Sequence, residues 1–211
     1  MTNHLYKYPK TLHVPWSEGV TNDDKILKNT KHFEGKKVVI TEKLDGENTT
    51  IAHNHIHARS LDSKDYPSRH WVKAMYSFTA STLEKHTRIC GENMYAQHSI
   101  AYENLDSYFY AFSVWRKHLC LSWETTISFL DLHNIITAPV IYIGLWNEDL
   151  CKSIKLGPTE KGEVEGYVVR LADAFDYDDF DKSVAKFVRA NHVQTDEHWL
   201  HKEVIPNKLK K

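Results

Sequence analysis

The order of the apolar runs along this chain most strongly limits its fold, because short strand-like runs outnumber helical runs and do not alternate with them. A regular alternation of strands and helices would indicate a doubly wound parallel sheet. We therefore expect an α+β domain in which helices flank antiparallel sheets. Strands are expected over residues 38–44, 48–52, 55–60, 88–95, 108–115, 140–143, 165–171 and 183–188, and helices near 23–31, over 68–86 and after Ser122.

The two longer helices should each cover a sheet with one apolar face. Ser68 and Ser122 are expected to be the N-caps of these helices, because a serine hydroxyl can accept a hydrogen bond from the first helical turn. The residues expected to face the core are Trp71, Met75, Phe78 and Leu83 in the first helix, and Ile127, Leu130 and Ile135 in the second.

The length and composition fit one globular domain. The chain has 211 residues, and its 27 basic residues nearly balance 28 acidic ones, so any contact with a polyanion must come from a local basic surface. Cys90, Cys120 and Cys151 lie far apart, which disfavours a disulfide framework and a zinc site. No apolar run approaches the ~18 residues that a membrane-spanning helix needs. We expect an intracellular, cytoplasmic monomer without a membrane partner.

The first stretch that indicates chemistry is Lys43-Leu44-Asp45-Gly46, which follows an apolar strand. A lysine held at this point could act as a nucleophile toward a phosphate, if its surroundings keep part of the amine neutral. Asp-Gly is also typical of a solvated hairpin turn. The stretch taken alone leaves both interpretations open.

Further segments in a fixed order favour the nucleophile. They are Ala58-Arg59-Ser60, Cys90-Gly91-Glu92-Asn93, Tyr110-Ala111-Phe112-Ser113, Glu165-Gly166-Tyr167-Val168-Val169-Arg170 and Lys186-Phe187-Val188-Arg189. With the lysine stretch, this set resembles the covalent nucleotidyltransferases, and most closely the nick-sealing ATP-dependent RNA ligases of the phage and kinetoplastid-editing type. The resemblance covers about residues 38–190, and it depends on the ordered set, because each segment alone is weak evidence.

The resemblance implies a nucleotidyltransferase fold, that is, an ATP-grasp-like ligase adenylation domain. It implies that Lys43 is the lysine that takes AMP, that Glu92 holds the ribose hydroxyls of ATP and that Phe112 stacks on adenine. Each role suits the residue type, because a flat ring can cover a base and a carboxylate can accept two vicinal hydroxyls. Phe112 alone would more often be a core residue, and Glu92 alone could cap a turn.

The resemblance also implies the residues around the phosphates. Arg59 should contact the phosphate end of the substrate, Glu165 should help to place a metal ion and its water, and Lys186 should neutralise the α-phosphate. Glu42, beside the nucleophile, is expected to join the ATP-binding set. Cations suit a transition state that spreads negative charge over phosphoryl oxygens.

The implied reaction is ATP-dependent joining of RNA 3′-hydroxyl and 5′-phosphate ends, possibly in a nicked duplex, through lysyl-AMP and an adenylylated 5′-end. The expected cofactors are ATP and Mg²⁺ or Mn²⁺, with few protein ligands to the metal. The alternatives are a minimal DNA ligase, an mRNA capping guanylyltransferase and, much less favoured, a non-catalytic nucleic-acid-binding protein.

Two departures from the family pattern matter. Val188 stands where a second lysine is common, so Lys182 or Arg189 should supply that charge, and the sequence does not decide between them. Only 25 residues, 187–211, follow Lys186, which is too few for an OB-fold domain. We expect an irregular N-terminal segment packed on the core (1–35), an adenylation domain (36–190) and a short C-terminal tail (191–211).

Three other features are expected to be less informative. His53, His55 and His57 alternate, which could indicate zinc but is more typical of a solvated hairpin face. The acidic run 173–181 is expected to be an exposed loop. The remaining set is in the tail, where aromatic and basic residues could contact nucleic acid or pack back on the domain: His192, His198, Trp199, His201, Lys202, Lys208, Lys210 and Lys211.

Overall fold

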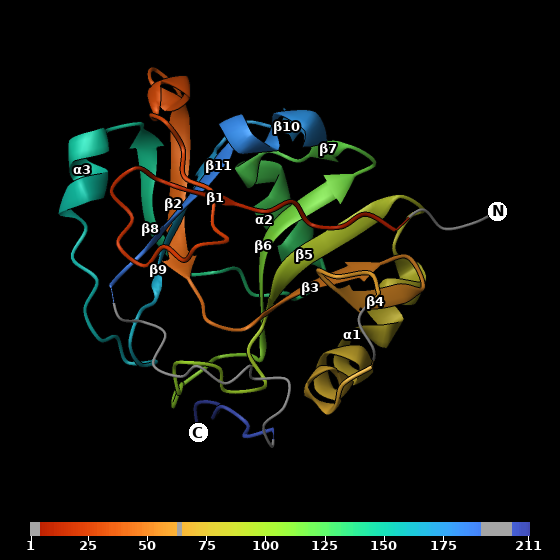
Figure 1. Cartoon of the computed structure of the whole chain (residues 1–211). Helices are drawn as coiled ribbons and strands as arrows, with labels where there is room; N and C mark the ends of the chain where they lie inside the picture. The colour runs from red at the N-terminus through yellow and green to blue at the C-terminus, as the bar shows by residue number, and fades with distance from the viewer. Residues whose placement is uncertain (1–4, 63–64, 191–203) are drawn as a thin grey trace.

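The protein forms two sheets with helices at their margins (Figure 1). The computed structural model describes residues 5–62, 65–190 and 204–211. The first sheet has the order β1 (Leu12–His13), β11 (Val184–Val188), β9 (Gly166–Leu171), β2 (Lys37–Lys43) and β8 (Val140–Leu145). The second sheet has the order β10 (Phe175–Asp176), β7 (Leu119–Cys120), β6 (Phe109–Arg116), β5 (Thr87–Asn93), β3 (Glu47–Ala52) and β4 (His55–Ala58).

Both sheets are antiparallel except for the two-residue pairing of β1 with β11, which is parallel. The helices are α1 (His70–Thr82), α2 (Trp123–Leu132) and α3 (Glu148–Ser153), with 3-10 turns at Lys31–Phe33, Pro67–Arg69 and Tyr177–Lys182. This mixture confirms the expected α+β class, and the residues that the structure describes form no OB-fold barrel. Within the same residues, no helix is long and apolar enough to cross a membrane.

Three apolar clusters hold the layers together. The first lies between the sheets and includes Ile40 and Val169 from the first sheet and Trp115 from the second. The second packs α1 and α2 against the second sheet, with Ile89 and Leu130 fully buried. The third, which includes Leu44, Met94, Ile100, Tyr102, Leu105, Tyr110 and Ala138, lies under the long connection between β5 and β6.

β2 lies inside the first sheet, between β9 and β8, and its first half is apolar on both faces. Val38, Val39 and Ile40 have no exposed surface, and β2 pairs with both β9 and β8. The β8 strand is at the edge of the sheet and exposes much of its apolar surface. The expected strand near 38–44 is therefore confirmed as the strand that leads into the lysine stretch.

The helix expected near 23–31 is wrong, since the only helical turn at this point is the 3-10 turn Lys31–Phe33. Asp24 instead accepts hydrogen bonds from the backbone and hydroxyl of Thr21, and such local bonds compete with helix formation. Backbone bonds also join Lys25 and Leu27 to His13, so this segment runs beside β1.

The start and the buried face of α1 also differ from expectation. Pro67 begins a 3-10 turn that includes Ser68, so α1 begins at His70 and Ser68 is not its cap. The buried residues are Val72, Tyr76, Ala80 and, just beyond the helix, Leu83. Met75 and Phe78 are 61% and 76% exposed, so the prediction that they face the core is wrong. By contrast, Ser122 caps α2 as expected, accepting a hydrogen bond from the amide of Thr125.

Candidate active site

The register of the first sheet places an acid beside the candidate nucleophile. Lys43 is the last residue of β2 and pairs with Gly166 of β9, so Glu165 lies next to it. The Lys43 ammonium donates a hydrogen bond to the Glu165 carboxylate, which is only 4% exposed. A side chain at Gly166 would collide with the Phe187 carbonyl oxygen, 1.9 Å from an ideal Cβ, so a glycine permits the close approach of β9 and β11.

The Asp45-Gly46 pair does not form a hairpin turn. It lies between β2 of the first sheet and β3 of the second, so the chain crosses from one sheet to the other immediately after Lys43. One oxygen of the Asp45 carboxylate accepts hydrogen bonds from the backbone amides of Ser99 and Ile100 at 2.8 and 2.9 Å. The solvated-turn interpretation of this stretch is therefore wrong.

Lys186 reaches the site from β11, two strands away from β2. Its ammonium lies 3.5 Å from the carboxylate of Asp24, which also lies 3.3 Å from the His13 ring and 3.9 Å from Lys10. Asp24 and Lys10 belong to the N-terminal segment, which is fastened to β11 by a hydrogen bond from the Val14 amide to the Lys186 carbonyl. Figure 1 shows this segment running in front of both sheets.

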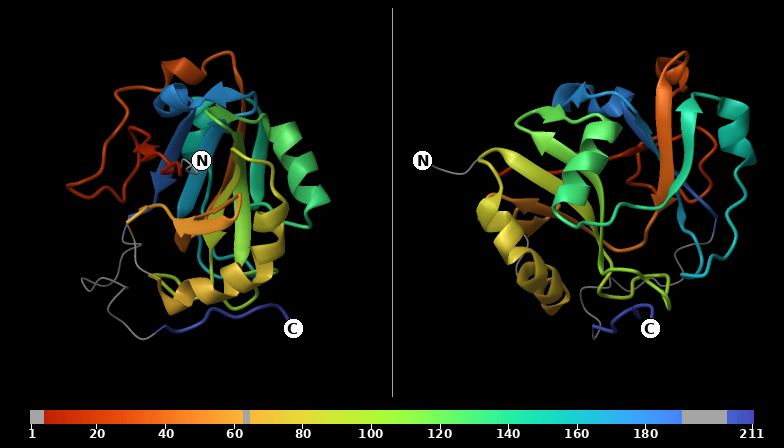
Figure 2. Two further views of the ribbon diagram at one scale, coloured as in Figure 1. Left: turned by 90° about the vertical axis from the view of Figure 1, so that its right-hand side faces the viewer. Right: turned by 180° about the vertical axis from the view of Figure 1, so that it is seen from behind.

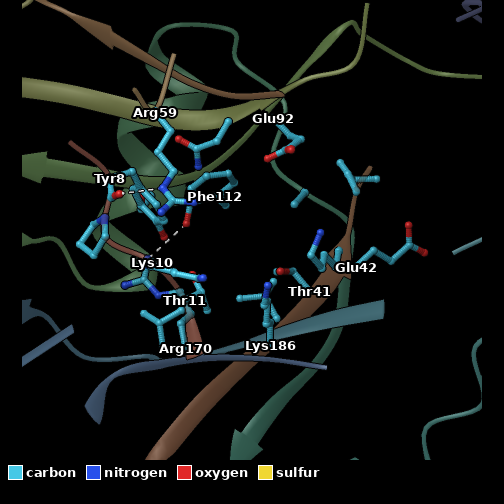
Figure 3. Close-up of a pocket in the computed structure, with 18 of the residues that line it drawn as sticks. Tyr8, Lys10, Thr11, Thr41, Glu42, Arg59, Glu92, Phe112, Arg170 and Lys186 are labelled. Atoms are coloured by element: carbon cyan, nitrogen blue, oxygen red, sulfur yellow. Dashed lines mark hydrogen bonds between the residues drawn. The ribbon is translucent and has the colours of Figure 1, made fainter. Parts of the chain in front are cut away.

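The second sheet supplies the opposite side of the site. Glu92 lies in β5, Phe112 in β6, and Arg59 directly after β4. The Phe112 ring makes an edge contact with Tyr8 at a centroid distance of 5.2 Å, and Arg59 donates a hydrogen bond to the Tyr8 carbonyl at 3.3 Å. Figure 3 shows Arg59, Phe112 and Glu92 on one side and Lys186 on the other.

These side chains surround a cavity of about 410 Å³ between the sheets. Every predicted site residue lines it except Glu165, which contacts Lys43: the lining set includes Glu42, Lys43, Arg59, Glu92, Phe112 and Lys186. The Glu42 carboxylate extends away from the other labelled residues in Figure 3, so its contact with a nucleotide remains a prediction. A cavity of this size, with an aromatic ring and several charges in its wall, suits a small charged ligand.

The charges around Lys43 are strongly coupled. Burial lowers the pKa of Lys43, but the carboxylates of Glu165, Glu92 and Asp45 outweigh it and hold that pKa above its ordinary value. Burial and the neighbouring acids raise the pKa of Glu92 to about 8. Burial and the charge of Lys43 lower the pKa of Lys186. The site thus holds Lys43 as an ammonium and Glu92 largely as a neutral acid at pH 7.

Neither candidate for the second family lysine lines the cavity. Lys182 is 70% exposed and pairs with Asp179, and Arg189 pairs with Glu163 and donates to the Val164 carbonyl. Lys10, which sequence reasoning missed, lines the cavity instead. Lys10 and Asp24 lie at the cavity because β1 pairs with β11, which joins residues far apart in the chain. No local motif could therefore have indicated them.

The alternating histidines, the acidic run and the tail were the other features noted in the sequence. The described residues contain no group of three or more histidine, cysteine or acidic side chains that could hold a metal ion, so the alternating histidines form no such site. The acidic run forms β10 and a 3-10 turn, with Phe175 and Phe180 buried. The tail residues His192, His198, Trp199, His201 and Lys202 lie outside the described residues. Lys208 is described, and it pairs with Glu103.

A family model settles which proteins this chain resembles: the model described as RNA ligase matches residues 36–188. The chain belongs to the RNA ligase family. Its fold is similar to that of Naegleria gruberi RNA ligase. Two mutants of that ligase with ATP and Mn match with TM-scores of 0.60 and 0.61 at 18% and 17% identity, covering 89% of this chain.

The structure of the same Naegleria gruberi ligase with PPi matches with a TM-score of 0.54 at 17% identity, covering 86% of this chain. The present chain covers 59%, 61% and 57% of those three Naegleria gruberi chains, or about three fifths of their length. A comparison with curated proteins found no match. The expected family and fold class are confirmed.

Proposed function

We propose that this chain is an ATP-dependent RNA ligase that joins 3′-hydroxyl and 5′-phosphate ends through lysyl-AMP at Lys43. The family match supports RNA ligation, and relatives solved with ATP or AMP and Mn support the choice of nucleotide and cation. The observation that carries the proposal is the convergence of Lys43, Glu165 and Lys186 from three adjacent strands beside a cavity whose opposite side carries Glu92 and Phe112.

The proposed reaction has three displacements at phosphorus. The Lys43 amine attacks the α-phosphorus of ATP, a nitrogen–phosphorus bond forms, pyrophosphate leaves and the amine gives up a proton. An oxygen of an RNA 5′-phosphate then attacks the AMP phosphorus, and Lys43 leaves and regains a proton. Finally a 3′-hydroxyl attacks the 5′-phosphorus and gives up its proton, AMP leaves and the strand is sealed.

Glu165 is the residue proposed to hold the divalent cation. Burial and the charge of Glu165 raise the pKa of both Asp45 and Glu92, and such a cluster of acidic groups fits a hard cation with oxygen ligands. The cation supplies charge neutralisation at the phosphates when it is bound. A cation held by Glu165 would take up part of the charge of this carboxylate. Glu165 would then raise the pKa of Lys43 less, and more of the amine would be neutral and able to attack.

The cationic side of the cavity should hold the phosphates. Lys186 points into the cavity beside Asp24, and its lowered pKa reflects a desolvated ammonium that a phosphate oxygen would stabilise. We assign to Lys10 the charge that a second lysine supplies in many relatives, because it lines the same cavity. We assign to Arg59, which also lines the cavity, the contact with the 5′-phosphate of the strand.

The test is incubation with ATP or GTP labelled at the α-phosphate, followed by sealing of nicked duplexes that carry RNA or DNA at the 3′-hydroxyl and 5′-phosphate ends. The proposal expects covalent label from ATP with Mg²⁺ or Mn²⁺ and sealing of RNA ends. Label from GTP alone would support the capping alternative, and sealing of DNA alone would support a DNA ligase. No label from either nucleotide would refute the proposal.

A further inference from the structure

The last described segment, residues 204–211, packs against the connection between β5 and β6, more than a hundred residues earlier in the chain. Pro206 bridges Ala96, and Leu209 bridges Leu105. Figures 1 and 2 show this segment lying along the loops of that connection. Because Lys208 pairs with Glu103 in this contact, the segment is joined to the domain by side chains as well as by backbone.

Asn207 is the anchor of this segment. It is 1% exposed, and its side chain makes three hydrogen bonds to the connection. Its amide nitrogen donates to the Met94 carbonyl at 2.7 Å and the Ala96 carbonyl at 3.3 Å, and its amide oxygen accepts from the Tyr102 backbone at 2.8 Å. An asparagine carries donors and an acceptor on one flat group, so it can link the two ends of the loop from Met94 to Tyr102.

The same loop holds Asp45. The amides of Ser99 and Ile100 donate to the Asp45 carboxylate, and the Tyr102 hydroxyl accepts a hydrogen bond from the Asp45 amide at 3.0 Å. Asp45 is two residues from Lys43, at the point where the chain leaves the first sheet. A path of two hydrogen-bonded contacts therefore runs from Asn207 through Tyr102 to Asp45.

We infer that Asn207 is a positioning residue for the adenylylation of Lys43: by linking Met94, Ala96 and Tyr102, it fixes the loop that holds Asp45 and so the end of β2. This inference rests on the proposed function. Small displacements of a reacting group slow a reaction strongly even when the substrate still binds. Asn207 should consequently affect the rate of AMP transfer to Lys43 more than the concentration of ATP that the protein requires.

The experiment compares Asn207→Ala with Ile205→Ala in the full chain. Ile205 is 57% exposed, and only its backbone carbonyl bonds to the loop, through the Gln97 amide, so it is a matched control in the same segment. The readouts are the single-turnover rate of lysyl-AMP formation at saturating ATP, the ATP concentration for half of that rate, and the melting temperature. We expect Asn207→Ala to lower the rate by about tenfold or more with a smaller change in half-saturation, and Ile205→Ala to match the wild type.

Tyr102→Phe tests the path with the anchor intact, because it removes only the hydroxyl that meets the Asp45 amide. It should also slow adenylylation, and combining it with Asn207→Ala should slow the reaction less than the product of the two separate effects. A wild-type rate in either single variant would overturn the inference, as would fully multiplicative effects. An unlabelled wild-type protein would instead refute the proposed function, so the two failures are distinguishable.

Discussion

The two sheets contribute differently to the site. The first sheet supplies Lys43 from β2, Glu165 from the residue before β9, and Lys186 from β11, and the register brings Lys43 and Glu165 into contact. The second sheet supplies Glu92 and Phe112, which face the cavity from the other side. Under the proposed function, the first sheet acts on the phosphate and the second sheet holds the nucleoside. Changes in the first sheet should alter rates, and changes in the second should alter affinities.

The largest effect is expected for Glu165→Gln. This change keeps the shape of the side chain but removes the carboxylate that pairs with Lys43, and with it the proposed contact to the cation. The single-turnover rate of lysyl-AMP formation at saturating ATP and Mg²⁺ should fall on the order of a hundredfold. Glu163→Gln is the matched control, because Glu163 pairs with Arg189 outside the cavity. Equal rates for the two variants would contradict the role of the first sheet in the phosphate chemistry.

A smaller effect, on affinity, is expected for Phe112→Ala. Loss of an aromatic ring that stacks on a base should raise the ATP concentration for half-maximal adenylylation by about tenfold, while the saturated rate changes little. Phe112 is also packed against the buried clusters, so Phe112→Leu serves as a control that keeps apolar volume without a flat ring. If the leucine variant binds ATP as tightly as the wild type, Phe112 is a core residue and does not stack on adenine.

The smallest effect is expected in the pH dependence of nucleoside binding. Because burial and nearby acids raise the pKa of Glu92 to about 8, this acid is mostly neutral at pH 7 and becomes a carboxylate above pH 8. A carboxylate accepts both ribose hydroxyls more strongly, so affinity should increase several-fold as the pH rises through about 8.

Adenosine is the ligand of choice for this titration, because it has no phosphate that ionises, and divalent cations are left out. His13 and His98 stay neutral over this range, since burial lowers the pKa of each. Adenosine affinity is measured by nuclear magnetic resonance at each pH. In Glu92→Gln this affinity should not change with pH. A rise of the same size in Glu92→Gln would assign the pH dependence to another group.

The strands that carry the site could be predicted from local patterns, and the residues that complete it could not. The apolar run before Lys43 and the run from Glu165 each give one strand, β2 and β9, within one or two residues of the expected bounds. Asp24 and Lys10 enter the cavity only because β1 pairs with β11 across most of the chain. The buried face of α1 could not be predicted from the sequence, because the spacing of its apolar residues allows two stripes. The contact with the second sheet selects the stripe that contains Tyr76.

The central claim is that Lys43 forms the covalent bond to AMP, and mapping that bond by mass spectrometry tests it most directly. The protein is incubated with ATP and Mg²⁺, digested under conditions that preserve the nitrogen–phosphorus bond, and compared with Lys43→Arg treated in the same way. We expect AMP on the peptide that contains Lys43 and no adenylylated peptide from the arginine variant. AMP on Lys186 or any other residue of the wild-type protein, or AMP retained by Lys43→Arg, would contradict it.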